Sequence, residues 1–114
     1  MNAIDTAHGM EYSMNDKDMY KDMVAIFIDQ RDQNVADIKG TFDAKDWDNY
    51  RIKVHGLKSN SRLVGGMDLG NLAEKCEHAA RDKDEATIVA ETPNLFALYD
   101  ETIAALKAID FNAL

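Results

Sequence analysis

Apolar residues recur every three or four positions along most of this chain, which is the spacing of one face of an α-helix. The pattern is strong in four segments and weaker in a fifth, from Ile4 to Met14, which predicts a brief helix or turn packed on the end of the body. Short connections between the segments favour antiparallel neighbours. We therefore predict an all-α fold, an antiparallel four-helix bundle with a short extra N-terminal helix. The four long helices are expected at residues 16–43, 47–64, 69–81 and 85–106.

Short polar side chains precede each long helix and are expected to cap it, because their oxygens can accept the unpaired N–H groups of the first turn. The predicted N-caps are Asn15, Asp46, Asp68 and Asp84. The pair Gly65-Gly66 should end the second long helix, since glycine readily takes the left-handed conformation of a helix end.

Two residues make the helix boundaries less simple. Gly40 is expected inside the first long helix, because Phe42 continues the apolar stripe beyond it. Pro93 lies within the last long helix and should kink it or restart it near Thr92, because proline lacks the N–H of the helical hydrogen bond.

The composition is that of one globular domain over residues 1–114. Hydrophobic residues make up 46% of the chain and charged residues 30%, which is ordinary for a folded soluble protein. One proline and six glycines leave little turn chemistry, which disfavours a many-stranded β fold.

Charge and cysteine content exclude several classes of partner and compartment. The net charge of −8 would repel phosphate backbones and anionic lipid, so we expect neither nucleic acid nor a membrane surface as a partner. The start, MNAIDTAHG, lacks the basic and apolar regions of a signal peptide. One cysteine cannot form an internal disulfide, which fits a reducing cytosol. The expected location is therefore cytoplasmic.

The stretch from Arg51 to Met67 contains no acidic residue, although the chain carries 21 of them. On a helix its apolar and small residues share one face, and a second stripe with His55 at its middle lies about 90° round from the centre of the first. That second stripe consists of Arg51, His55, Lys58 and Arg62. The pattern predicts an exposed histidine among cations, with no carboxylate partner beside it.

Such a histidine is arranged to receive an anion. The ring is mostly neutral at pH 7 when unperturbed, hence nucleophilic. Gly56 and Ser59 are small and leave the ring edge open, while Lys58 lies one turn further on. A lone histidine on a helix is more often a surface residue without function, but the acid-free surroundings favour a functional one.

At this point the sequence resembles the histidine-containing phosphotransfer domains of bacterial phosphorelays. Members of that family carry a histidine, a lysine three residues later, a small residue next, and a glycine ten residues after the histidine. The matching residues here are His55, Lys58, Ser59 and Gly65, followed by Leu69, Leu72 and Glu77 in the next helix. Many members have glycine in place of Ser59, and a small or neutral residue in place of Arg62.

The resemblance implies a phosphocarrier without kinase activity of its own. His55 would accept a phosphoryl group from a receiver-domain aspartate and pass it to another receiver, and Lys58 would neutralise the phosphoryl oxygens. Arg62 or Ser59 would assist. The implied partners are receiver domains of response regulators or hybrid sensor kinases, and any Mg²⁺ would belong to the receiver. No cofactor or metal is expected in this chain, which we predict to be a monomer.

Two large aliphatic residues flank the predicted site. Ile52 and Leu63 project from the side of the helix away from its core stripe, with Gly56 between them, so both are expected to be substantially exposed and to contact the receiver. The alternative function is a non-catalytic helical adaptor or interaction module, which would gain no phosphate from a phosphorylated receiver.

Other potential ligands lack a supporting pattern. His8 and His78 have no metal-ligand spacing with each other or with Cys76, so both are expected at the surface. Cys76 falls on the apolar stripe of its helix and is predicted to be buried.

Overall fold

A computed structural model describes residues 4–114 of the chain. Within that range the secondary structure is helical, with no strand. The elements are α1 (Thr6–Tyr12), α2 (Lys17–Asp29), α3 (Arg31–Asp43), α4 (Trp47–Leu63), α5 (Met67–Arg81), α6 (Glu85–Lys107) and the 3-10 turn η1 (Phe111–Ala113).

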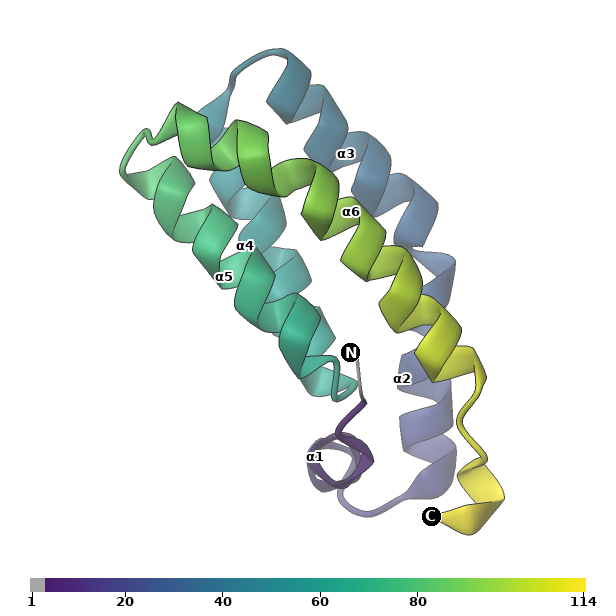
Figure 1. The fold of residues 1–114 in the computed structure, drawn as a ribbon. Coiled ribbons are helices and arrows are strands. Elements are labelled where there is room, and N and C mark those ends of the chain that lie inside the picture. Colours follow the sequence, from purple (N-terminus) through teal and green to yellow (C-terminus); the bar gives the residue numbers. More distant parts are fainter. Residues whose placement is uncertain (1–3) are drawn as a thin grey trace.

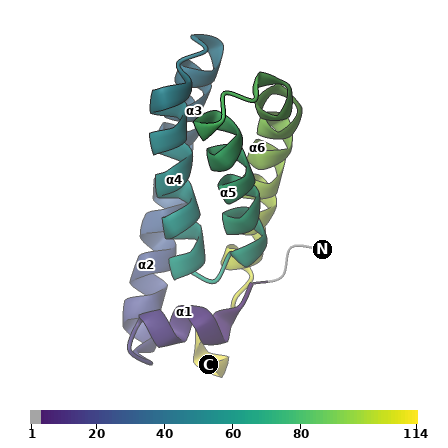
Figure 2. The ribbon, with the colours of Figure 1, turned by 90° about the vertical axis from the view of Figure 1, so that its left-hand side faces the viewer.

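The long helices form an elongated bundle whose principal extents are 43 × 23 × 21 Å. Helices α2 and α3 follow each other along one side, and α4, α5 and α6 complete the bundle with alternating directions (Figure 1). Seen from the side, α1 lies across the end of the bundle where the α4–α5 connection is found (Figure 2). With α2 and α3 counted as one long element, the predicted four-helix bundle with a short extra N-terminal helix is confirmed.

The first long element is not continuous as predicted, because it breaks at Gln30. This residue forms a one-residue turn with a near-helical backbone, with φ −82° and ψ −7°, so α3 follows α2 directly. Immediately after the break, Arg31 donates two hydrogen bonds to the Asp100 carboxylate of α6, at 2.8 and 3.1 Å. This pair ties α3 to α6. The prediction that the helix reaches Asp43 with Gly40 inside it is confirmed.

Two of the predicted caps are confirmed and two are wrong. The carboxylates of Asp46 and Asp84 accept backbone N–H groups of Asn49 and Thr87 at 3.3 and 3.2 Å. Asp16 caps α2 in place of Asn15, which takes a positive φ of 59° in the preceding turn.

Helix α5 begins two residues earlier than predicted, and Pro93 does not interrupt α6. Gly66 stands at the N-cap of α5 without a side-chain hydrogen bond, and Asp68 lies in the first helical turn. Helix α6 is continuous across Pro93, so the predicted restart near Thr92 is wrong. The exposed position of Pro93 explains why its missing N–H is tolerated, since the unpaired carbonyl one turn earlier can face water.

Three buried tyrosines link the helices through their hydroxyl groups, and one of them, Tyr99 of α6, accepts a hydrogen bond from the side-chain amide of Asn34 in α3 at 3.1 Å. Tyr50 and Thr92 are joined at 2.7 Å, and because the Thr92 hydroxyl donates to the carbonyl of Ile88, Tyr50 is the donor in the first bond. Tyr20 donates to the carbonyl of Val64 at 2.8 Å, and burial raises its pKa to about 12. Buried hydroxyls without such partners would be costly. The predicted burial of Cys76 is confirmed.

Gly65 makes the tight connection between α4 and α5, as the sequence predicts. Its φ is +88°, a conformation that other residues rarely adopt. Its carbonyl accepts the backbone N–H of Asp5 at 2.8 Å, and a Cβ at this position would stand 2.2 Å from the carbonyl oxygen of Asp5. The segment leading into α1 therefore rests directly on this turn.

Candidate functional site

Helix α4 presents the two stripes that its sequence predicts. One face is buried, and it carries Tyr50, Val54, Leu57 and Ser61. The His55 side chain points away from that face and is 58% exposed. The helical spacing alone is enough to explain this exposure, because a residue one position from Val54 turns by about 100° around the axis.

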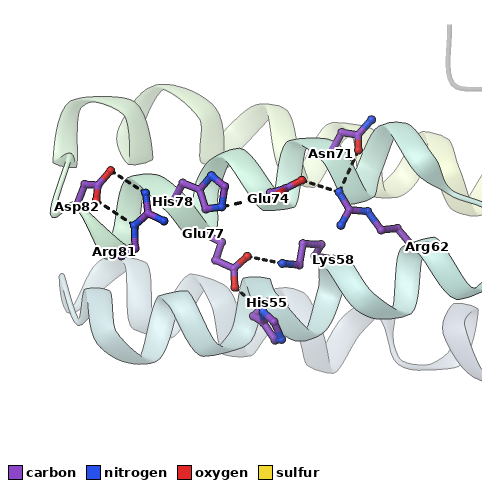
Figure 3. Close-up of polar contacts among 9 residues, drawn as sticks. All are labelled: His55, Lys58, Arg62, Asn71, Glu74, Glu77, His78, Arg81 and Asp82. Carbon is purple, nitrogen blue, oxygen red and sulfur yellow. Dashed lines mark hydrogen bonds and ion pairs between the residues drawn. The ribbon is translucent and has the colours of Figure 1, made fainter.

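The surroundings of His55 differ from the prediction in one central respect, since a carboxylate lies beside it. Glu77 of α5 contacts Nδ1 of the His55 ring through Oε2, and its Oε1 accepts a hydrogen bond from Nζ of Lys58 at 2.6 Å (Figure 3). One carboxylate thus joins the histidine and the lysine. The expectation of a cationic site without an acid beside the histidine is wrong.

Glu77 and Lys58 are much less exposed than the histidine they surround. Their side chains are 13% and 16% exposed, because they lie in the seam between α4 and α5. Burial alone would raise the pKa of the Glu77 carboxyl, but the hydrogen bonds from Lys58 and His55 outweigh it and hold that pKa below its usual range. Glu77 is therefore a carboxylate anion at neutral pH.

A carboxylate on one ring nitrogen determines what the other can do. An imidazole whose Nδ1 faces an anion keeps its proton there, and the Nε2 lone pair is left available. Because the ring is exposed, Nε2 is accessible from solvent. The site therefore offers a positioned nitrogen nucleophile with a lysine nearby.

Arg62, which is expected to assist at the phosphoryl group, is hydrogen-bonded to side chains of α5. Its guanidinium donates to the carboxylate of Glu74 at 2.6 Å and to the side-chain oxygen of Asn71 at 3.1 Å, both on α5 (Figure 3). The hydrogen bond from Arg62 lowers the pKa of Glu74. A methyl group on Gly70 would lie 2.8 Å from Cγ of Arg62, so the arginine stem lies against that glycine. Arg62 is a second link across the α4–α5 seam.

Of the two aliphatic residues predicted to be exposed beside His55, only one is. Ile52 is 59% exposed, as expected, and Gly56 has open space where a Cβ would lie. Ser59 is also exposed. Leu63 is half-buried, contrary to the prediction. Leu63 instead lines a hollow of about 190 Å³ between α2 and α4, together with Met23, Ile26, Phe27, Gln30, Asn60 and Val64.

The remaining candidates lie away from His55. Gly65 is part of the α4–α5 turn, so its part is structural. His78 stands 3.8 Å from Glu74, and the His8 ring packs against Tyr12. Among residues 4–114, no group of three or more histidine, cysteine or acidic side chains is placed to hold a metal ion. In the same range, no helix has the length and apolar character to cross a membrane.

Glu77 is the residue whose role the sequence alone did not reveal. It occurs among the residues that carry the resemblance, but it lies twenty-two positions from His55 in the sequence. A contact between the two can be predicted only when the relative register of α4 and α5 is known. The segment from Arg51 to Met67 contains no acidic residue, but α5 places the carboxylates of Glu74 and Glu77 beside its cations.

The comparisons with known proteins identify the family. The family model described as "Hpt domain" matches residues 22–109, which leaves α1 outside the match and includes the whole of α3 to α6. No curated protein and no solved structure matches this chain. The matched range spans more than half of the chain and contains His55, Lys58 and Glu77. This chain belongs to the histidine-containing phosphotransfer domain family, whose members carry phosphoryl groups in phosphorelays and interact with receiver domains.

Proposed function

We propose that His55 is the phosphorylated residue, and that it accepts a phosphoryl group from a receiver-domain aspartate and passes it to another receiver. The observation that carries this proposal is the exposed His55 ring with Nδ1 against Glu77, which leaves Nε2 free to attack. Of the other two histidines, His8 packs against the Tyr12 ring, and His78 lies 3.8 Å from the Glu74 carboxylate, which is already bonded to Arg62.

The chemistry needs little beyond positioning and charge neutralisation. The Nε2 lone pair forms the N–P bond, the P–O bond of the acyl phosphate breaks, and its electrons leave with the aspartate carboxylate. Lys58 would move its ammonium group from Glu77 towards the phosphoryl oxygens, which carry the larger negative charge. The chain would act as a phosphocarrier, with no kinase reaction of its own. Ser59, exposed one turn beyond His55, is a further candidate for contact with the phosphoryl group.

The receiver would dock on the α2 side of His55. Ile52 and Gly56 form the part of this surface next to the ring, and Leu63 connects it to the hollow beside α2. Ile26 at the rim of that hollow is 55% exposed. Exposed aliphatic side chains beside a small hollow provide a patch suited to a transient complex, which a relay requires.

Intact-mass measurement after incubation with a phosphorylated receiver tests the proposal. Wild type should gain one acid-labile phosphate, and His55→Gln should gain none while keeping its helical circular dichroism spectrum. His8→Gln and His78→Gln are matched controls and should gain phosphate like wild type.

Two outcomes would contradict this assignment. Label on His55→Gln would place the phosphorylated residue elsewhere. Binding of a receiver with no phosphate gained by wild type would support the second candidate function, a helical adaptor without chemistry, for which the exposed aliphatic patch is the favouring observation.

A further inference from the structure

The contact between Glu77 and the His55 ring has a consequence for the proton on Nδ1. Phosphoryl transfer onto Nε2 draws the lone pair of that nitrogen into the new bond, and the ring becomes positively charged if Nδ1 keeps its hydrogen. Away from any anion such a ring readily gives up that proton to water. Here the Nδ1 hydrogen faces a carboxylate that is largely removed from solvent.

We propose that Glu77 keeps the proton on Nδ1 of His55 throughout the phosphorylated state, so that the ring leaves as a neutral imidazole in the onward transfer. This inference rests on the proposed function of His55. Glu77 is in this sense a positioning residue for a proton, since it touches the reacting ring on the side opposite to the phosphoryl group.

The bonds and charges balance without any proton transfer. In the first half, Nε2 gains the phosphoryl group and the ring gains a positive charge, which the Glu77 carboxylate offsets. In the second half, an aspartate oxygen of the acceptor forms its bond to phosphorus, the N–P bond breaks, and its electron pair returns to Nε2. Because Nδ1 still carries hydrogen, the product is neutral imidazole. A ring that had lost this proton would have to leave as an imidazolate anion, which is a far poorer leaving group.

Other charged side chains around the ring also affect how firmly Nδ1 holds its proton. Arg51 and Lys58 lie on α4 one turn to either side of His55, while the charge of Arg81 on α5 interacts with that of Glu77. The Lys53–Asp37 pair, 4.0 Å apart, lies towards α3. These cations favour loss of the ring proton, and Glu77, which contacts Nδ1, opposes them. When Lys58 moves to the phosphoryl group, the full carboxylate charge is left to the ring.

The proton can be observed directly in the full-length chain. Histidine labelled with ¹⁵N would be phosphorylated with phosphoramidate, a small donor that needs no receiver, and the Nδ1 resonance followed from pH 6 to pH 9. Wild type should keep its Nδ1 hydrogen to a pH at least about one unit higher than Glu77→Gln, since one unit corresponds to a tenfold change in proton affinity. Glu74→Gln, which removes an α5 carboxylate that binds Arg62 and not the ring, should behave as wild type.

Onward transfer provides the second measurement. Each pH unit above the loss of the proton removes about nine-tenths of the reactive protonated form. The ratio of the Glu77→Gln transfer rate to the wild-type rate should therefore fall from near one, at a pH where both proteins keep the proton, to about one-tenth for each unit of difference, at a pH where both have lost it. A purely structural role would give a ratio that does not change with pH. Using the ratio removes the pH dependence of the receiver itself.

The outcomes separate this inference from the function on which it rests. If phosphoramidate and phosphorylated receivers both leave His55 unmodified, the proposed function fails. If His55 is phosphorylated but wild type and Glu77→Gln lose the Nδ1 proton at the same pH, or the rate ratio is independent of pH, only the role of Glu77 is overturned. A phosphorylated peptide of residues 51–62 serves as a second reference, because wild type should retain the proton to higher pH than this peptide even if Glu77→Gln folds poorly.

Discussion

Lys58 holds its charge in the seam between α4 and α5, where it is only 16% exposed and bonded to Glu77. A preorganised cation of this kind stabilises charge that develops on transferred phosphoryl oxygens. We expect Lys58→Ala to slow transfer by about 10- to 100-fold without preventing it, because the nucleophile remains. Single-turnover transfer of ³²P in both directions would measure the effect.

A matched control for this change exists on α5. Lys75 also reaches across a helix pair, to Glu91 at 3.6 Å, but on a part of the surface separate from the His55 contacts. Lys75→Ala should transfer at the wild-type rate. Equal rates for wild type and Lys58→Ala would show that Lys58 serves only the contact with Glu77.

The lowered pKa of Glu77 makes part of the stability dependent on pH. A carboxyl group whose pKa is lower in the folded state than in the unfolded chain contributes stability that is present above the unfolded pKa, near 4.5, and lost as pH falls through the folded value. Wild type should therefore be more stable than Glu77→Gln at pH 5, and the difference should shrink as the pH is lowered from 5 towards 3. Urea unfolding followed by circular dichroism at each pH measures it, and a difference that is unchanged over this range would show that the carboxylate charge does not stabilise the fold.

At the scale of the helix, two glycines allow fold and function to be separated. Gly56 in α4 and Gly40 in α3 both have open space where a Cβ would lie. Replacing glycine by alanine inside a helix stabilises it by about 0.5–1 kcal/mol. Gly40→Ala and Gly56→Ala should therefore both raise the melting temperature, but only Gly56→Ala should slow transfer, because it adds a methyl group on the docking surface next to His55.

The two variants differ only in position, so their comparison is direct. Thermal unfolding and single-turnover transfer would be measured for each against wild type. If Gly56→Ala transferred as fast as Gly40→Ala, the receiver would not approach this part of α4.

The helices themselves could be predicted well, because their apolar spacing and caps are local. The wrong caps illustrate the limit of that approach. Asn15 and Asp16 are adjacent and equally suited, and the choice depends on the positive φ that Asn15 takes to turn the chain. Gly66, and not Asp68, is the N-cap of α5, because the helix begins directly after the Gly65-Gly66 turn and Asp68 already lies in its first turn. The break at Gln30 lies beside a contact that local spacing does not predict, since Arg31 binds Asp100, sixty-nine positions away.

The contacts around the site needed the whole molecule. Spacing within α4 is sufficient to predict that His55 is exposed, but the partners of Lys58, Arg62 and Leu63 all come from other helices. The surface of α4 is basic when this helix is considered alone, but with α5 beside it the surface carries charges of both signs. Helix periodicity gives the direction in which a side chain points, whereas bundle register decides what it meets.

The proposed docking of a receiver on the combined α2 and α4 surface predicts a pattern of variant effects. Ile52→Asp and Ile26→Asp should each weaken receiver binding and slow transfer, with little change in stability, because both side chains are more than half exposed. Val89→Asp is the matched control, since Val89 is 50% exposed on α6. Titration calorimetry with a receiver and thermal unfolding measure the two effects.

The pattern also has outcomes that would contradict it. If Ile26→Asp bound like wild type while Ile52→Asp did not, the receiver would cover α4 alone and the hollow beside α2 would lie outside the complex. Equal loss of binding in Val89→Asp would point to a general effect of added negative charge on a chain with a net charge of −8.

The seam between α4 and α5 also bears on how quickly the molecule reaches its folded state. These two helices form the most extensive pair in the bundle, and three residues connect them. Contacts between residues close in the sequence form with little loss of conformational entropy and form early. Contacts between α6 and α3 join residues far apart in the sequence and cost more entropy. The α4–α5 hairpin contains His55, Lys58 and Glu77, so these three residues can meet before the bundle closes. Substitutions in this hairpin should then act mainly on the rate of folding, and those at the Arg31–Asp100 contact mainly on the rate of unfolding.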